Sequence, residues 1–146
     1  MRFSFTGVLL ALGAAVTWGL VYAIDQRLLQ RTSPILLLVI NSVISSFLLS
    51  PVLLARKGAL EPLHFLTPRT SVFLVAAIVL GAVANLLIYS SITTIGAPLA
   101  SVLEIAYPFF VVTFDFLLFH ERPTSSLILG GTLIFVGAAI IVARRG

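Results

Sequence analysis

The chain has 146 residues, of which 60% are hydrophobic and 10% are charged, and its mean hydropathy is +1.17. Soluble domains carry about 25% charged residues, so this composition excludes an ordinary soluble domain. The absence of cysteine excludes disulfides, thiolate metal sites and cysteine nucleophiles. The net charge is +4, but the basic residues form no stripe that would suit a nucleic acid.

Five apolar runs follow one another along the chain, and each is long enough to cross a membrane as a helix. A hydrocarbon core about 30 Å thick requires about 20 helical residues. The chain is therefore predicted to be an all-α integral membrane protein, a bundle of about five transmembrane helices in a single domain over residues 1–146. The runs cover residues 7–24, 35–55, 72–92, 99–119 and 127–143.

The first run combines a stripe of small residues with two aromatic side chains. Trp18 and Tyr22 lie four residues apart and share one face of a helix. Small residues at every fourth position allow helix backbones to approach closely, either within the chain or in a dimer. The stripe consists of Gly7, Ala11, Ala15, Gly19 and Ala23.

Polar residues interrupt the second and third runs. Asn41 lies in the second run, and Asn85 and Tyr89 lie four residues apart in the third. Together with Trp18 and Tyr22 they are candidates to line a cavity that takes an organic cation or an amphipathic metabolite. The alternatives are an aromatic belt at the membrane surface and simple interhelical hydrogen bonds.

The fourth run contains two acids, which are costly inside a bilayer. Glu104 lies about 6 Å from the middle of the run, and Asp115 lies nearer its far end. In a continuous helix the eleven residues between them make about three turns, which places both acids on nearly one face. Tyr107 is a further lining residue, and Pro108 is expected to kink the helix.

Glu104 is the strongest candidate for a functional group, because no Lys or Arg lies within any of the five runs to neutralise it. It is predicted to bind a proton or a cation in a water-filled cavity. The alternative is a permanently protonated Glu that is hydrogen-bonded to a neighbouring helix. Asp115 is a candidate second acid, although its position near a helix end also allows it to reach interfacial water.

Lys and Arg are distributed almost evenly between the two sides of the predicted bundle. The positive-inside rule therefore gives either a weak orientation with the N-terminus inside or insertion in both directions. Dual insertion would supply the two inverted halves from which many transporters are built. One side has Arg2, Arg56, Lys57, Arg69 and Arg122, and the other has Arg27, Arg31, Arg144 and Arg145.

Short motifs also run through the chain in a fixed order. They are Trp18-Gly19, Ser33-Pro34, Tyr89-Ser90-Ser91-Ile92 followed by Ala97 to Leu103, Tyr107-Pro108-Phe109-Phe110, Phe119 to Thr124, and Gly130 to Gly137. As a set they resemble one EamA-type half of the drug/metabolite transporter superfamily. Two positions depart from that pattern: His120 stands where the family commonly has Gly, and Asn41 stands near a position that is often Arg. Most relatives join two such halves in one chain.

The resemblance implies a carrier that moves small organic solutes or metabolites by alternating access, with proton linkage as an option. Its expected partners are the lipid bilayer, a small-molecule substrate, and either a second copy in a homodimer, parallel or antiparallel, or a second half-transporter. The expected location is the plasma (inner) membrane, as a multi-pass protein, with no cofactor. The alternative is a non-transporting scaffold or regulatory subunit derived from a half-transporter.

Enzymatic and metal chemistry are not expected from this sequence. No nucleophile, base and orienting group occur together in a recognisable arrangement. His64 and His120 lie in connecting segments and have no second ligand at metal-binding spacing.

Overall fold

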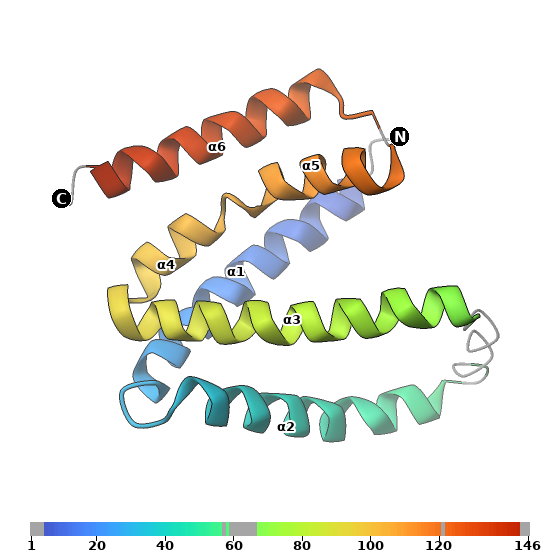
Figure 1. Cartoon of the computed structure of the whole chain (residues 1–146). Helices are drawn as coiled ribbons and strands as arrows, with labels where there is room; N and C mark the ends of the chain where they lie inside the picture. The colour runs from blue at the N-terminus through green and yellow to red at the C-terminus, as the bar shows by residue number, and fades with distance from the viewer. Residues whose placement is uncertain (1–4, 57, 59–66, 121, 144–146) are drawn as a thin grey trace. The chain divides into compact units, whose positions relative to one another are not determined.

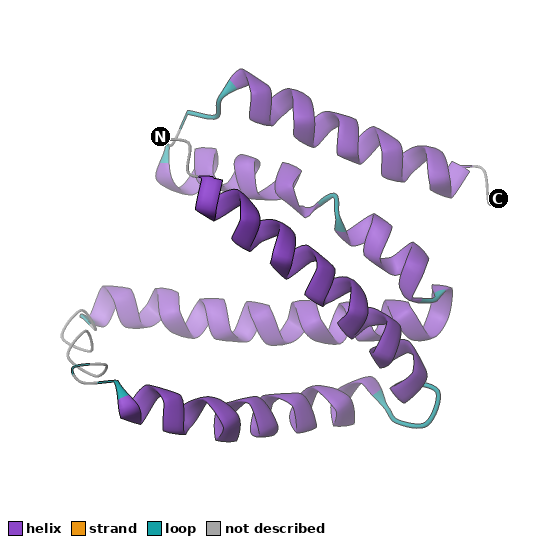
Figure 2. Ribbon diagram, turned by 180° about the vertical axis from the view of Figure 1, so that it is seen from behind, coloured by secondary structure: helices purple, strands orange, loops and turns teal. Residues whose placement is uncertain are grey.

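The computed structural model describes residues 5–56, 58, 67–120 and 122–143, and every regular element among them is an α-helix (Figures 1 and 2). Five stretches are long and apolar enough to cross a membrane, and α4 and α5 together make one of them. The prediction of an all-α membrane protein with five spans is confirmed. The helices are α1 (Phe5–Leu28), α2 (Pro34–Ala55), α3 (Pro68–Ile95), α4 (Ala97–Glu104), α5 (Tyr107–Phe119) and α6 (Ser125–Ala143).

Local chemistry explains where the helices begin. The Ser33 side chain caps α2 by accepting a hydrogen bond of 3.3 Å from the Leu36 N–H, and Pro34 occupies the first turn, where no N–H donor is needed. Proline also begins α3, at Pro68. Between α3 and α4 the chain turns at Gly96, whose φ of 83° is a conformation that glycine adopts without a steric penalty.

The fourth span consists of two helices, α4 and α5, and the sequence predicted a kink at Pro108 within this span. α4 ends at Glu104 and α5 begins at Tyr107, and Figure 1 shows the interruption between them. Pro108 has no N–H, and a proline ring clashes with the carbonyl four residues earlier, which here belongs to Glu104. The regular helix is therefore interrupted near Pro108, and Ile105 and Ala106, which lie between α4 and α5, keep backbone angles in the right-handed helical region.

The C-terminal end of α5 has an unusual backbone conformation. His120 has a φ of 56° and a ψ of 24°, which is the left-handed region, and its N–H bonds to carbonyls of the last turn. Glycine is the usual residue at this position of a helix end, and His is among the residue types that tolerate it. The departure from the EamA-type Gly therefore falls where the backbone itself favours glycine.

Contacts divide the chain into two compact units, which are described separately. The first, unit 1, comprises Met1–Ala23 and Ile95–Gly146, and the second, unit 2, comprises Ile24–Thr94. In unit 1, α6 packs against α4 and α5, and α5 and α6 run antiparallel (Figures 1 and 2). In unit 2, α2 and α3 run antiparallel (Figures 1 and 2).

A glycine sets the close approach of α6 to α5. A Cβ atom added at Gly131 would lie 3.6 Å from the Phe109 Cα, so the α6 backbone rests on the α5 backbone at this point. The Phe109 ring also lies 5.6 Å from the Phe135 ring of α6. At the neighbouring Gly130 an added Cβ would meet nothing within 4 Å. Of these two adjacent glycines, Gly131 therefore faces α5 at close range and Gly130 does not.

Large apolar side chains are exposed along all the spans of the isolated chain. Val16 is 77% exposed, Phe47 is 76% exposed and Leu54 is 73% exposed. In water such a surface would drive aggregation, but lipid tails are as apolar as these side chains. The exposed apolar surface therefore indicates contact with the lipid bilayer.

Candidate functional site

The first polar cluster lies in unit 1 and joins α1 to α4. The Tyr22 hydroxyl donates a hydrogen bond to the Glu104 carboxylate, although 82 residues separate them in the chain. The Tyr22 ring lies 5.7 Å from the Trp18 ring, at an interplanar angle of 59°. We call Trp18, Tyr22 and Glu104 the Glu104 cluster. All three were predicted from the sequence as cavity residues.

These aromatic residues lie deep in their helix. From the bounds of α1, Trp18 is about 2 Å and Tyr22 about 8 Å from the midpoint of the helix along its axis. The surface of a hydrocarbon core lies about 15 Å from its centre. A hydrocarbon core centred on the midpoint of α1 would therefore include both rings.

The Glu104 cluster contains one acid and no Lys or Arg. Glu104 is the last residue of α4. Arg122 is the one Lys or Arg in the described part of unit 1, and the 13 residues of α5, about 20 Å of helix, separate it from the break that follows Glu104. This arrangement is suited to a positively charged ligand.

The second polar cluster lies in unit 2. The Asn41 side-chain amide donates a hydrogen bond of 2.8 Å to the Tyr89 hydroxyl, which joins α2 to α3. Tyr89 is buried, with 4% of its surface exposed. Asn85 does not join this pair: its amide donates a 2.8 Å hydrogen bond to the Gly81 carbonyl of its own helix.

Asp25 belongs to the same unit and was missed by the sequence analysis. It lies in α1, is only 3% exposed, and its Oδ2 atom has no hydrogen-bond partner among the described residues. The buried Tyr89 of α3 lies in the same unit. We call Asp25, Asn41 and Tyr89 the Asp25 cluster.

The sequence did contain part of the signal for Asp25. The first apolar run ends at Ile24. However, Gln26, Arg27 and Leu28 are good helix formers, and no helix breaker occurs before Ser33-Pro34. The helix was therefore predictable as far as Leu28. The burial of Asp25 was not, because it depends on the helices that pack around it.

The remaining predicted residues lie elsewhere on α5. Tyr107 is 60% exposed and Asp115 is also exposed, and among the described residues no hydrogen bond or ring contact joins either of them to the Glu104 cluster. Pro108 lies in the first turn of α5. Both acids of the fourth run are exposed, and among the described residues a side-chain hydrogen bond is seen for Glu104 and not for Asp115.

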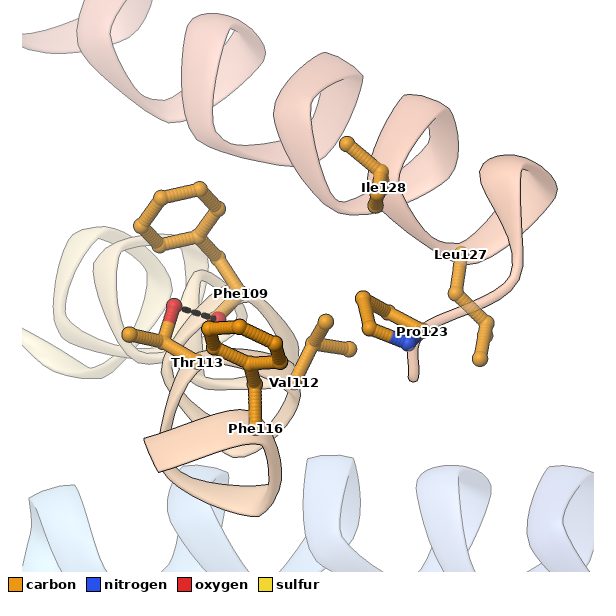
Figure 3. A pocket seen from close by; sticks show the side chains of 7 residues that line it. All are labelled: Phe109, Val112, Thr113, Phe116, Pro123, Leu127 and Ile128. Carbon is orange, nitrogen blue, oxygen red and sulfur yellow. Dashed lines mark hydrogen bonds between the residues drawn. The ribbon is translucent and has the colours of Figure 1, made fainter. Parts of the chain in front are cut away.

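A hollow of about 220 Å³ lies between α5 and α6 (Figure 3). Its one polar side chain is Thr113, whose hydroxyl donates a 2.8 Å hydrogen bond to the Phe109 carbonyl, drawn as a dashed line in Figure 3. A solute site needs polar groups that orient its ligand, and this hollow provides none that is not already bonded. The lining residues are Phe109, Val112, Thr113, Phe116, Pro123, Leu127 and Ile128.

The comparison with protein families gives one match. Residues 5–143 match the family model described as the EamA-like transporter family. No curated protein and no solved structure matches the chain significantly. Both polar clusters lie within the matched residues.

Proposed function

The chain belongs to the EamA-like transporter family, and we propose that it carries a small organic cation across the membrane by alternating access. Membership in this family indicates a membrane transporter of the drug/metabolite superfamily rather than an enzyme. The proposal that the substrate is an organic cation rests on the hydrogen bond between Tyr22 and Glu104 beside the Trp18 ring. It supports a negative, aromatic site at membrane depth.

The chemistry of the Glu104 cluster favours a cation over other solutes. A carboxylate and the carbonyl end of a helix attract positive charge, and the face of an indole or phenol ring adds cation–π attraction. Interrupted helices with exposed ends provide the solute and ion sites of many transporters near the middle of the bilayer. The break between α4 and α5, directly after Glu104, matches this arrangement.

The same carboxyl group, that of Glu104, would also link cation transport to proton movement. A single carboxylate neutralises either one proton or one cation, so the two compete for Glu104. We therefore expect the bound proton to leave when the organic cation arrives and to return when the cation leaves. Such competition would let a proton gradient drive the cation in the opposite direction.

A ligand screen in lipid nanodiscs tests the proposal. Purified protein is heated with a panel of organic cations and with neutral and anionic solutes of similar size. A cation that binds the folded state raises the thermal midpoint, and we expect it to release protons in weakly buffered solution. Stabilisation by anions instead, or by no solute in the panel, would contradict the proposal, and the second result would favour a scaffold or regulatory subunit.

We further propose that two such units form the working carrier. Most relatives of the EamA-type pattern join two halves, and an antiparallel homodimer would provide the inverted pair that alternating access uses. The near-even distribution of Lys and Arg supports insertion in both directions. Of the residues in that comparison, Arg2, Lys57, Arg144 and Arg145 lie outside the described residues.

Single cysteines can measure the orientation, because the chain has none of its own. We expect Phe3→Cys and Gly146→Cys each to label in part from both sides of sealed membranes. Adding two Lys beside Arg2 should make each label report one side, and the two sides should be opposite because the spans number five. Complete one-sided labelling of the otherwise unchanged chain would exclude dual insertion and favour a separate partner half.

A further inference from the structure

The Asp25 cluster shares no residue with the Glu104 cluster and contains an acid for which the proposed function has no use. Asp25 is 3% exposed, and Tyr89 of the same unit is 4% exposed. The Oδ2 atom of Asp25 has no hydrogen-bond partner among the described residues. Buried polar groups are nearly always hydrogen-bonded, so an unpartnered carboxyl oxygen at this burial requires an explanation.

No basic residue in its surroundings explains it. α2 contains no ionisable residue, and the ionisable residues of α3 are Arg69 and Tyr89. Arg69 is at the other end of α3, twenty residues and about 30 Å from Tyr89. Arg27 and Arg31 follow Asp25 in the chain, but no described residue bonds to its Oδ2 atom. An ionised Asp25 would therefore be a buried, uncompensated charge, which is far more costly than a neutral carboxyl group.

We propose that Asp25 is a proton-binding site in the membrane, distinct from Glu104, and that Tyr89 and Asn41 receive its carboxylate when the proton leaves. Either a proton or a metal cation would neutralise the carboxylate. A metal ion requires several oxygen ligands, and among the described residues no group of three or more His, Asp or Glu is placed to hold one. The proton needs only the carboxyl oxygen itself.

The hydrogen bond between Asn41 and Tyr89 leaves the Tyr89 hydroxyl able to donate to the deprotonated Asp25. The Tyr89 oxygen accepts the 2.8 Å bond from the Asn41 amide, so the hydrogen of its own hydroxyl is not used in that bond. A tyrosine hydroxyl is both donor and acceptor. A movement of the Asp25 side chain toward Tyr89 would let the Tyr89 hydroxyl donate to the carboxylate while Asn41 holds the ring in place. The deprotonated Asp25 would then have a hydrogen-bond donor.

Infrared difference spectroscopy on the full chain in nanodiscs tests the assignment. At neutral pH we expect a C=O stretching band of a protonated carboxylic acid that moves on exchange into D₂O. Asp25→Asn, which is neutral and of nearly the same shape, should lose this band, and Glu104→Gln should keep it. A band that persists in Asp25→Asn, or no such band in the wild-type chain, would overturn the proposal.

Two further measurements keep the test decisive if Asp25→Asn does not fold. Tyr89→Phe should shift the frequency of the band, and Tyr22→Phe, a matched tyrosine in the other cluster, should leave it unchanged. Equal effects of the two variants would contradict the role of Tyr89. Loss of the band on adding Na⁺ to sodium-free buffer would assign a metal site and overturn the proton site. Failure of cation binding at Glu104 would leave all these results unaffected, so the two proposals fail separately.

Discussion

Replacement of Glu104 by Gln is expected to lower the affinity for the organic cation about 10- to 100-fold. Hydrogen bonds and contacts to a charged group contribute about 1.5–3 kcal/mol, and about 1.4 kcal/mol corresponds to a factor of ten. Gln keeps the size of Glu and its ability to accept a hydrogen bond from Tyr22, but it has no negative charge. The measurement is a titration of the best cation from the ligand screen, by calorimetry in nanodiscs.

Two further variants make this prediction specific. Tyr22→Phe removes the hydroxyl that donates to Glu104 but keeps the ring beside Trp18, so we expect a smaller loss, of about 3- to 10-fold. Asp115→Asn removes the same charge as Glu104→Gln from an exposed position on α5, and it should bind as the wild-type chain does. Proton release should also disappear in Glu104→Gln alone. Equal losses for the Glu104 and Asp115 variants would indicate a general effect of charge rather than a site.

Replacement of Gly131 by Leu is expected to destabilise the fold by about 1–3 kcal/mol, the usual cost of forcing extra volume into a packed contact. Even a Cβ atom at this position would lie 3.6 Å from the Phe109 Cα, and the rest of a Leu side chain would have to push α6 away from α5. The measurement is the unfolding midpoint in a mixed-micelle denaturation series.

Gly130→Leu is the matched control, because it places the same side chain one residue away where an added Cβ meets nothing within 4 Å. Both variants replace a helical glycine by a better helix former, so any gain in helix propensity is shared. We expect the control to unfold at or above the wild-type midpoint. Equal destabilisation by both variants would show that α6 does not pack on α5 through Gly131.

The sequence by itself determined the fold class and most of the spans. Runs of about 20 apolar residues have one stable arrangement in a bilayer, in which each backbone N–H and C=O is bonded within its own helix. This requirement is local, so it can be seen without knowledge of the neighbours. The motif series from Trp18-Gly19 to Gly130–Gly137 likewise indicated the family that the match over residues 5–143 shows.

Only the tertiary structure decided which polar residues meet. The bond between Tyr22 and Glu104 joins residues 82 positions apart, and helical periodicity carries no information over that distance. The same periodicity predicted one face for Asp115 and Glu104, and the regular helix between them is interrupted before Pro108. Asp25 stands near a helix end in the sequence, where exposure is expected. Its burial depends on the packing of other helices around it, and packing between helices is what a single sequence does not display.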